Sequence, residues 1–158
     1  MTEKRYYIAY GSNLNVPQMQ MRCPDAKILG TANLKGWELL FKGSKTGSYL
    51  TIERNEDGSV PVAIWEVSER DERALDRYEG FPTFYYKQKI KVRYKGIRTG
   101  LRRTVNAFAY IMHEERHVGI PSNAYLRICI EGYDTFYFNR NVLLAAYDKC
   151  RRLCENEG

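Results

Sequence analysis

The sequence has 158 residues with 44% hydrophobic content, enough to bury a core without staples, so a single domain over residues 1–158 is expected. Membrane-spanning helices need about 20 apolar residues in a row, whereas the longest apolar candidate here covers only residues 142–147. The formal charge of +6 and the 13 tyrosines raise the question of nucleic acid, but the basic residues are scattered in pairs such as Arg102-Arg103. A solvated surface of mixed charge is the better interpretation, and neither nucleic acid nor a membrane is expected as a partner.

Four cysteines, Cys23, Cys129, Cys150 and Cys154, occur in a sequence whose start does not resemble a secretion signal. Reduced thiols and a soluble, cytoplasmic protein are therefore expected. Cys150 and Cys154 lie one helical turn apart, but two thiols without partners make an incomplete metal site. They are interpreted as apolar fillers of a helix.

The first half of the chain reads as strands with one short helix. Residues 5–10 predict a strand that ends at Gly11-Ser12-Asn13, and residues 16–21 predict a helix with Pro17 near its start. Turn residues then separate four strand-like runs, with breaks at Lys35-Gly36, at 43–47 and at Asp57-Gly58. These runs cover residues 26–34, 37–42, 49–54 and 60–67.

The second half adds helices to this sheet. Ser68 and Asp71 form a capping pattern that predicts a helix over 69–78, ending at Glu79-Gly80. A hairpin of strands at 85–94 and 102–112 follows, and helical periodicity covers 123–138 and 140–154. The fold class is therefore α+β, with a mixed, curled β-sheet or small β-barrel and flanking helices.

Two short motifs imitate known sites. The segment from His113 to His117 matches the zinc-peptidase pattern, but it leaves a strand, is almost entirely charged and soon meets Gly119, so a solvated loop is expected instead of a helix. The run over 43–48 lacks a lysine directly after its second glycine, which a phosphate loop requires. A flexible polar turn is expected there.

Two other constellations can carry chemistry. Gly11 lies where a strand turns, so the backbone N–H groups of this loop can approach a ligand closely. Glu79 ends a helix, where carbonyl dipoles and the neighbouring rings of Tyr78 and Phe81 disfavour its charged form. Both effects raise the pKa of a carboxyl group, as a general acid and base near neutral pH requires. The alternative is a solvated Glu followed by Gly80 as a helix cap.

These residues resemble a known family. Ile8-Ala9-Tyr10-Gly11-Ser12-Asn13-Leu14, Leu75-Asp76 leading to Glu79-Gly80, Tyr85, and Pro121-Ser122 ahead of Tyr125 follow the order and spacing of the γ-glutamyl cyclotransferases and their AIG2-like relatives. The resemblance covers nearly the whole chain. It implies a mixed β-barrel with helices around it.

The resemblance also implies an activity, in which the α-amine of a γ-glutamyl compound attacks its own γ-carbonyl and releases 5-oxoproline without a metal or cofactor. Glu79 resembles the family's acid and base, Tyr10, Gly11, Ser12 and Asn13 its substrate loop, and Tyr85 and Tyr125 two ring or hydroxyl contacts. Glu131-Gly132 repeats the Glu-Gly pair inside a helical pattern and is assigned no role. The alternatives are a non-catalytic binder on the same fold and a basic nucleic-acid-binding protein. The residues leave open the leaving group and whether the protein is a monomer or a homodimer.

Overall fold

Two long paired strands form the larger part of the sheet. A computed structural model describes residues 4–44 and 47–156, in which β2 (Lys27–Ser44) pairs antiparallel with β3 (Gly47–Val67) along almost its whole length. Four separate strands were expected here, and that prediction was wrong. The predicted break at Lys35-Gly36 is a register shift, because Lys35 pairs with Ser59 and Trp37 with Arg54, so that residues 55–58 bulge out while pairing continues on both sides. Residues 45–46 of the predicted polar turn lie outside the described residues.

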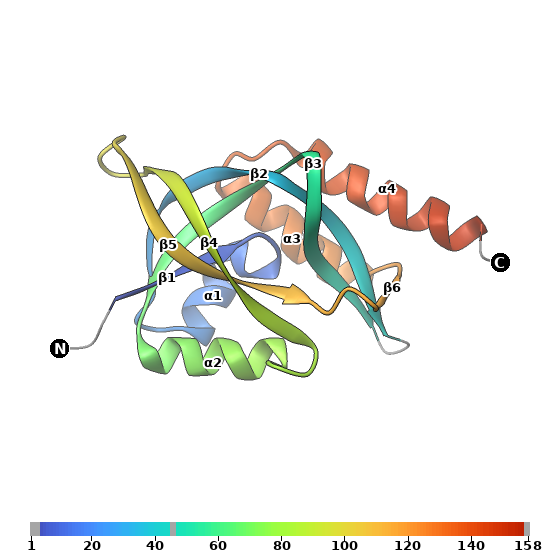
Figure 1. Ribbon diagram of the computed structural model, residues 1–158, viewed down its shortest axis with the longest axis horizontal. Coiled ribbons are helices and arrows are strands. Elements are labelled where there is room, and N and C mark those ends of the chain that lie inside the picture. The colour runs from blue at the N-terminus through green and yellow to red at the C-terminus, as the bar shows by residue number, and fades with distance from the viewer. Residues whose placement is uncertain (1–3, 45–46, 157–158) are drawn as a thin grey trace.

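The remaining strands close this sheet on itself. β1 (Arg5–Ala9) pairs with β3 and, in parallel, with β5 (Arg102–Met112), which forms the predicted hairpin with β4 (Tyr85–Gly96). β4 returns to β2, so the order β3-β1-β5-β4-β2 ends on the β2–β3 pair and gives a closed barrel of mixed direction. Figure 1 shows these strands curling around one another. The predicted α+β class with a small mixed barrel is confirmed.

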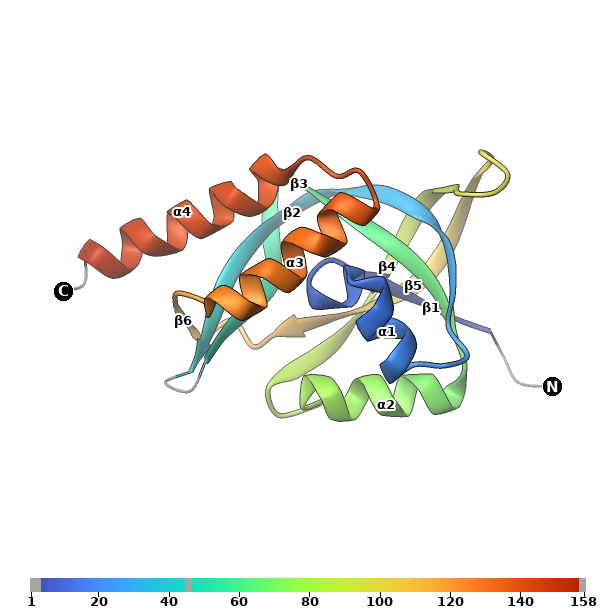
Figure 2. The same cartoon turned by 180° about the vertical axis from the view of Figure 1, so that it is seen from behind.

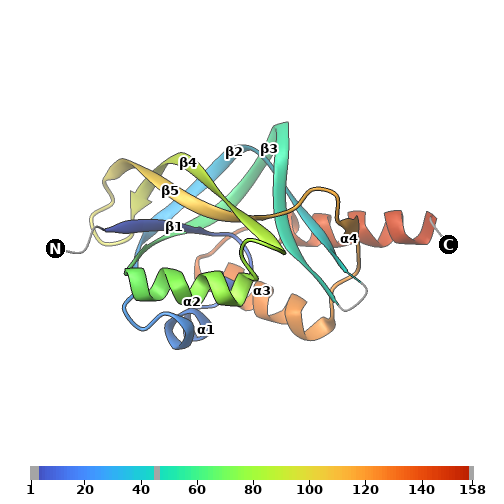
Figure 3. The ribbon, with the colours of Figure 1, turned by 60° about the horizontal axis from the view of Figure 1, so that its bottom comes forward.

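The helices lie outside the barrel. α1 (Val16–Arg22) and α2 (Glu69–Glu79) lie below it in Figure 3, and α3 (Asn123–Thr135) crosses the face seen in Figure 2. α4 (Arg140–Asn156) packs on β2. The predicted helix 123–138 ends earlier because Tyr137 adopts a left-handed conformation, with φ of 58°.

Both ends of α2 form as the sequence predicts. The Ser68 hydroxyl accepts a hydrogen bond from the Asp71 N–H, and the Asp71 carboxylate accepts one from the Ser68 N–H. Gly80 takes the left-handed conformation, with φ of 65°, that stops the helix directly after Glu79. Local sequence signals therefore determine that α2 ends at Glu79.

α3 holds the turn after β1 in place. That turn is a short 3-10 helix, η1 (Ser12–Leu14), and Gly132 of α3 lies against it. A Cβ atom on Gly132 would lie 2.6 Å from Leu14 Cβ and 2.7 Å from the Leu14 carbonyl carbon. The unassigned Glu131-Gly132 pair thus lets α3 approach the turn, and Glu131 also accepts a hydrogen bond of 3.0 Å from the Asn15 side chain.

The segment from His113 to His117 is not helical. β5 ends at Met112, a turn follows, and His117 starts β6 (His117–Val118), a two-residue strand on the end of β2. The helical spacing of two histidines that the zinc motif requires is therefore missing. In the described part of the chain, no group of three His, Cys, Asp or Glu side chains is placed to hold a metal ion, and no helix is long and apolar enough to cross a membrane.

Candidate active site

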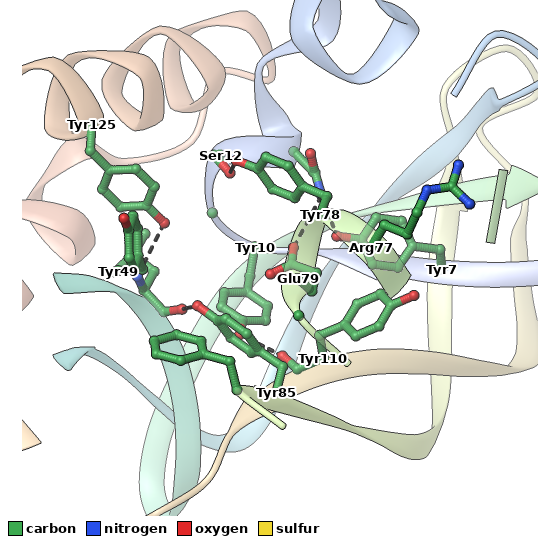
Figure 4. Close-up of a pocket in the computed structure, with 15 residues that line it drawn as sticks. Tyr7, Tyr10, Ser12, Tyr49, Arg77, Tyr78, Glu79, Tyr85, Tyr110 and Tyr125 are labelled. Atoms are coloured by element: carbon green, nitrogen blue, oxygen red, sulfur yellow. Dashed lines mark hydrogen bonds between the residues drawn. The ribbon is translucent and has the colours of Figure 1, made fainter. Parts of the chain in front are cut away.

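One cavity of about 440 Å³ opens where the turn after β1, the end of α2, β3, β4 and α3 meet. Figure 4 shows its side chains converging from these elements. It contains all seven residues that the sequence singled out, together with others that the sequence analysis did not name. The lining residues are Tyr7, Tyr10, Gly11, Ser12, Asn13, Tyr49, Leu50, Arg77, Tyr78, Glu79, Gly80, Phe84, Tyr85, Tyr110 and Tyr125.

The residues Tyr10 to Asn13, here called the Gly11 loop, form one wall of the cavity. The turn is closed by hydrogen bonds of 3.0 Å from the Leu14 N–H to the Gly11 carbonyl and from the Asn15 N–H to the Ser12 carbonyl. Within residues 4–44 and 47–156, the N–H groups of Gly11, Ser12 and Asn13 donate to no backbone carbonyl. Three successive N–H groups of this kind can bind an anion.

Glu79 is the carboxyl group of the cavity. Its Oε1 lies 3.5 Å from Nδ2 of Asn13, on the Gly11 loop. Burial raises the pKa of Glu79 from its usual value near 4.5 to about 8, and the positive charge of Arg22 opposes this rise. Glu79 can therefore hold or release a proton close to neutral pH, as the sequence analysis expected of this position.

Asn13 is oriented by groups on both sides. Its Nδ2 donates a hydrogen bond of 2.8 Å to the Tyr7 hydroxyl, and its Oδ1 accepts one from Arg22. The Arg22 guanidinium also lies 3.4 Å from the centre of the Tyr78 ring, and the Tyr78 hydroxyl lies 3.0 Å from Oγ of Ser12. Arg22 thus contacts both the Gly11 loop and the residue before Glu79.

The tyrosines present mainly their rings to the cavity. Tyr85 donates a hydrogen bond of 2.8 Å to the Leu50 carbonyl, and Tyr125 accepts one of 3.1 Å from the Leu50 N–H. The Tyr10 hydroxyl donates to the Tyr110 carbonyl at 2.6 Å. Since these hydroxyls are bonded to the main chain, the three side chains support the wall of the cavity.

Sequence reasoning missed Tyr7 and Arg22. Tyr7 lies on β1 directly before the motif, and its hydroxyl is recognised as a site group only once the Asn13 side chain is placed. Arg22 ends α1 and belongs to no motif. Tyr78 was named as a ring beside Glu79, but its contacts with Ser12 and Arg22 were not predicted.

Residues 7–127 match the family model described as "Gamma-glutamyl cyclotransferase, AIG2-like". The chain belongs to this family. Two gamma-glutamylcyclotransferases, from Bos taurus and from Homo sapiens, are each 31% identical to it over 91 residues. These matches cover 53% of this chain and 48% of each relative, so the chain spans about half the length of the curated relatives it matches.

The barrel is also found in solved structures. A structure named "Gamma-glutamyl cyclotransferase" superposes with a TM-score of 0.76 at 24% identity, over 94% of this chain and 87% of that one. The human protein loc79017 gives a TM-score of 0.71, also at 24% identity and with the same coverage. At this identity the likeness establishes the fold alone.

Proposed function

We propose that this protein is a γ-glutamyl cyclotransferase. The observation that carries the proposal is the Glu79 carboxyl group, which lies in the cavity beside the Gly11 loop with a pKa near neutrality. In the reaction, the substrate's α-nitrogen bonds to its γ-carbonyl carbon, the γ-amide C–N bond breaks, and 5-oxoproline and an amine leave.

The substrate supplies both nucleophile and electrophile. The protein's main task is to fold the short glutamyl chain until its amine faces the γ-carbonyl. Such proximity can lower the activation barrier by about 7–11 kcal/mol. The 440 Å³ cavity offers a confined space for that conformation. No protein nucleophile takes part.

Glu79 moves the protons. The α-ammonium group has three protons, and the ring nitrogen of 5-oxoproline keeps one. Glu79 takes the first proton as carboxylate, which frees the lone pair for attack, and it then returns a proton to the leaving nitrogen. The remaining proton passes through Glu79 to the departed amine or to water, which restores the carboxylate.

The Gly11 loop stabilises negative charge on the substrate. The N–H groups of Gly11, Ser12 and Asn13 are available to the substrate α-carboxylate or to the oxyanion that develops on the γ-carbonyl. Asn13 links these donors to Glu79, so charge stabilisation and proton transfer occur side by side.

The test is product analysis with a panel of γ-glutamyl amino acids and γ-glutamyl amines. The purified protein should form 5-oxoproline from at least one of them, and Glu79→Gln should form far less. A matched control is Glu115→Gln, because Glu115 is exposed and lies in the turn after β5. Binding of these compounds without any turnover would indicate the non-catalytic binder instead. The absence of both binding and turnover would contradict the proposal.

A further inference from the structure

The cavity has two chemically unlike ends, which meet where Gly11 lies beside Tyr125 and Leu50. Near Glu79, the Gly11 loop presents N–H, amide and hydroxyl groups. At the other end, Tyr49 and Tyr125 lie together away from Glu79 and Ser12, as Figure 4 shows. Tyr49, Leu50, Phe84 and Tyr125 are here called the aromatic end. The proposed mechanism uses the first end and leaves this second end without a role.

The rings of the aromatic end are packed against one another. The Tyr49 ring lies edge to face with Tyr125, at 5.2 Å between centroids and 86° between planes, and with Phe84, at 6.2 Å and 82°. The Arg116 guanidinium lies 4.5 Å from the centre of the Phe84 ring. The packed rings form an aromatic wall before any ligand arrives.

The main-chain polar groups of Leu50 in this wall are already engaged. The Leu50 N–H donates to the Tyr125 hydroxyl, and the Leu50 carbonyl accepts from Tyr85. The glutamyl half of a substrate carries an ammonium, a carboxylate and an amide, and burying such groups without hydrogen bonds is costly. The glutamyl half therefore fits beside Glu79 and the Gly11 loop, and the substituent of the leaving nitrogen extends to the aromatic end.

Tyr49 lies partly in solvent, as Tyr78 does beside Glu79. The Tyr49 side chain is 40% exposed although it lines the cavity, so a substituent larger than the enclosed space can continue past it toward solvent. Aromatic walls of this kind recognise apolar groups by contact area and ring geometry. A small or strongly polar leaving group would leave the rings uncovered.

We propose, on the basis of the function proposed above, that the aromatic end is a subsite for the leaving amine. The preferred substrates are γ-glutamyl compounds whose leaving amine carries an aromatic or large apolar group. A buried phenyl ring in place of a methyl group is worth a factor of about ten or more in kcat/KM in such a pocket.

The direct test compares γ-glutamylphenylalanine with γ-glutamylalanine. With the wild-type protein, kcat/KM for 5-oxoproline formation should be at least about tenfold higher for the phenylalanine compound. Equal values, or a preference for the alanine compound, would overturn the subsite while leaving the cyclotransferase activity in place.

Variants test whether the aromatic end causes the preference for γ-glutamylphenylalanine. Tyr49→Ala should lower the ratio of the two kcat/KM values several-fold, and its exposed side chain makes the change mild for folding. The matched control is Tyr137→Ala, since Tyr137 is 96% exposed, lies just beyond α3 and does not line the cavity. An unchanged ratio in a folded Tyr49→Ala protein would contradict the assignment.

A binding measurement separates the two proposals. If no compound of the γ-glutamyl panel yields 5-oxoproline, the proposed activity fails, and the subsite is then judged by calorimetry of γ-glutamylphenylalanine and γ-glutamylalanine with the Glu79→Gln protein. Tighter binding of γ-glutamylphenylalanine, lost in the Glu79→Gln/Tyr49→Ala double variant, would support the subsite. Equal binding of the two compounds would refute it.

Discussion

The side-chain amide of Asn13 lies 3.5 Å from the carboxyl group of Glu79, although 66 residues separate them in the chain. This contact joins the turn after β1 to the end of α2. The contact holds the proposed donors for negative charge beside the proposed proton carrier.

Replacing Glu79 by Gln should lower kcat by about 10²- to 10⁴-fold, because an amide cannot accept and return a proton. The fold should persist, since the two side chains have nearly the same shape. Steady-state 5-oxoproline formation measures the effect, with circular dichroism as the check on folding. Turnover within a few-fold of wild type would remove Glu79 from the mechanism.

The same variant should change the pH dependence of stability. Because burial raises the pKa of Glu79 from near 4.5 to about 8, the folded protein retains a proton in this range that the unfolded chain releases. This residue's contribution to stability therefore becomes less favourable as pH rises from about 4.5 to 8 and stays so above it. Glu79→Gln avoids this cost.

Thermal unfolding at several pH values checks this sign. The Tm of Glu79→Gln should exceed that of wild type by several degrees above about pH 8, since about 1 kcal/mol shifts Tm by about 2–4 °C in a protein of this size. The difference should shrink toward about pH 4.5. A difference that is constant with pH would argue against a half-buried Glu79 that titrates with a raised pKa.

Arg22→Met should move the pH profile of activity. The Arg22 charge lowers the pKa of Glu79, so its removal should raise that pKa and shift the rising limb of kcat/KM to higher pH. Arg22→Lys keeps the charge but not the planar stacking on Tyr78, and should shift the limb less. A lower kcat/KM with an unmoved limb would mean that Arg22 acts only as a structural support.

Gly11 can be tested with a graded pair of variants. A Cβ atom there would lie 3.4 Å from the Tyr125 hydroxyl and from Leu50 Cβ, so Gly11→Ala should stay within several-fold of wild type. The branched side chain of Gly11→Val would press on both groups, and overpacking of about 1–3 kcal/mol corresponds to roughly a 5- to 150-fold loss in kcat/KM. If the valine variant bound a substrate analogue as tightly as wild type, the Gly11 loop would have no role in binding.

The elements that could be predicted from sequence are those with local signals. The Ser68 cap and the left-handed Gly80 define both ends of α2, and the Tyr-Gly turn ends β1, so local signals place Glu79 and the Gly11 loop at the ends of their elements. Their proposed roles come from the family resemblance, because the residues alone left a solvated Glu79 open. The continuity of β2 and β3 could not be predicted. It depends on pairing across the sheet, which absorbs Lys35-Gly36 and Asp57-Gly58 in a register shift.

The directions of the side chains within the site could not be predicted from the sequence either. Tyr10 donates to a carbonyl 100 residues away, and Tyr125 bonds a main-chain group 75 residues away, so whether their hydroxyls face the cavity depends on the closed barrel. Arg22 is only nine residues from Asn13, but their contact requires the orientation that α1 takes against η1. No pattern in the sequence encodes that orientation.

The most direct test of the central claim is which atom attacks the γ-carbonyl. A γ-glutamyl compound that wild type processes should be incubated in ¹⁸O-labelled water beside its N-acetylated form, and the products analysed by mass spectrometry. Attack by the α-amine predicts unlabelled 5-oxoproline from the free-amine compound and no cleavage of the acetylated one, because acetylation removes the attacking lone pair. Labelled glutamate from the first compound, or cleavage of the second, would show that water attacks and would contradict the cyclotransferase assignment.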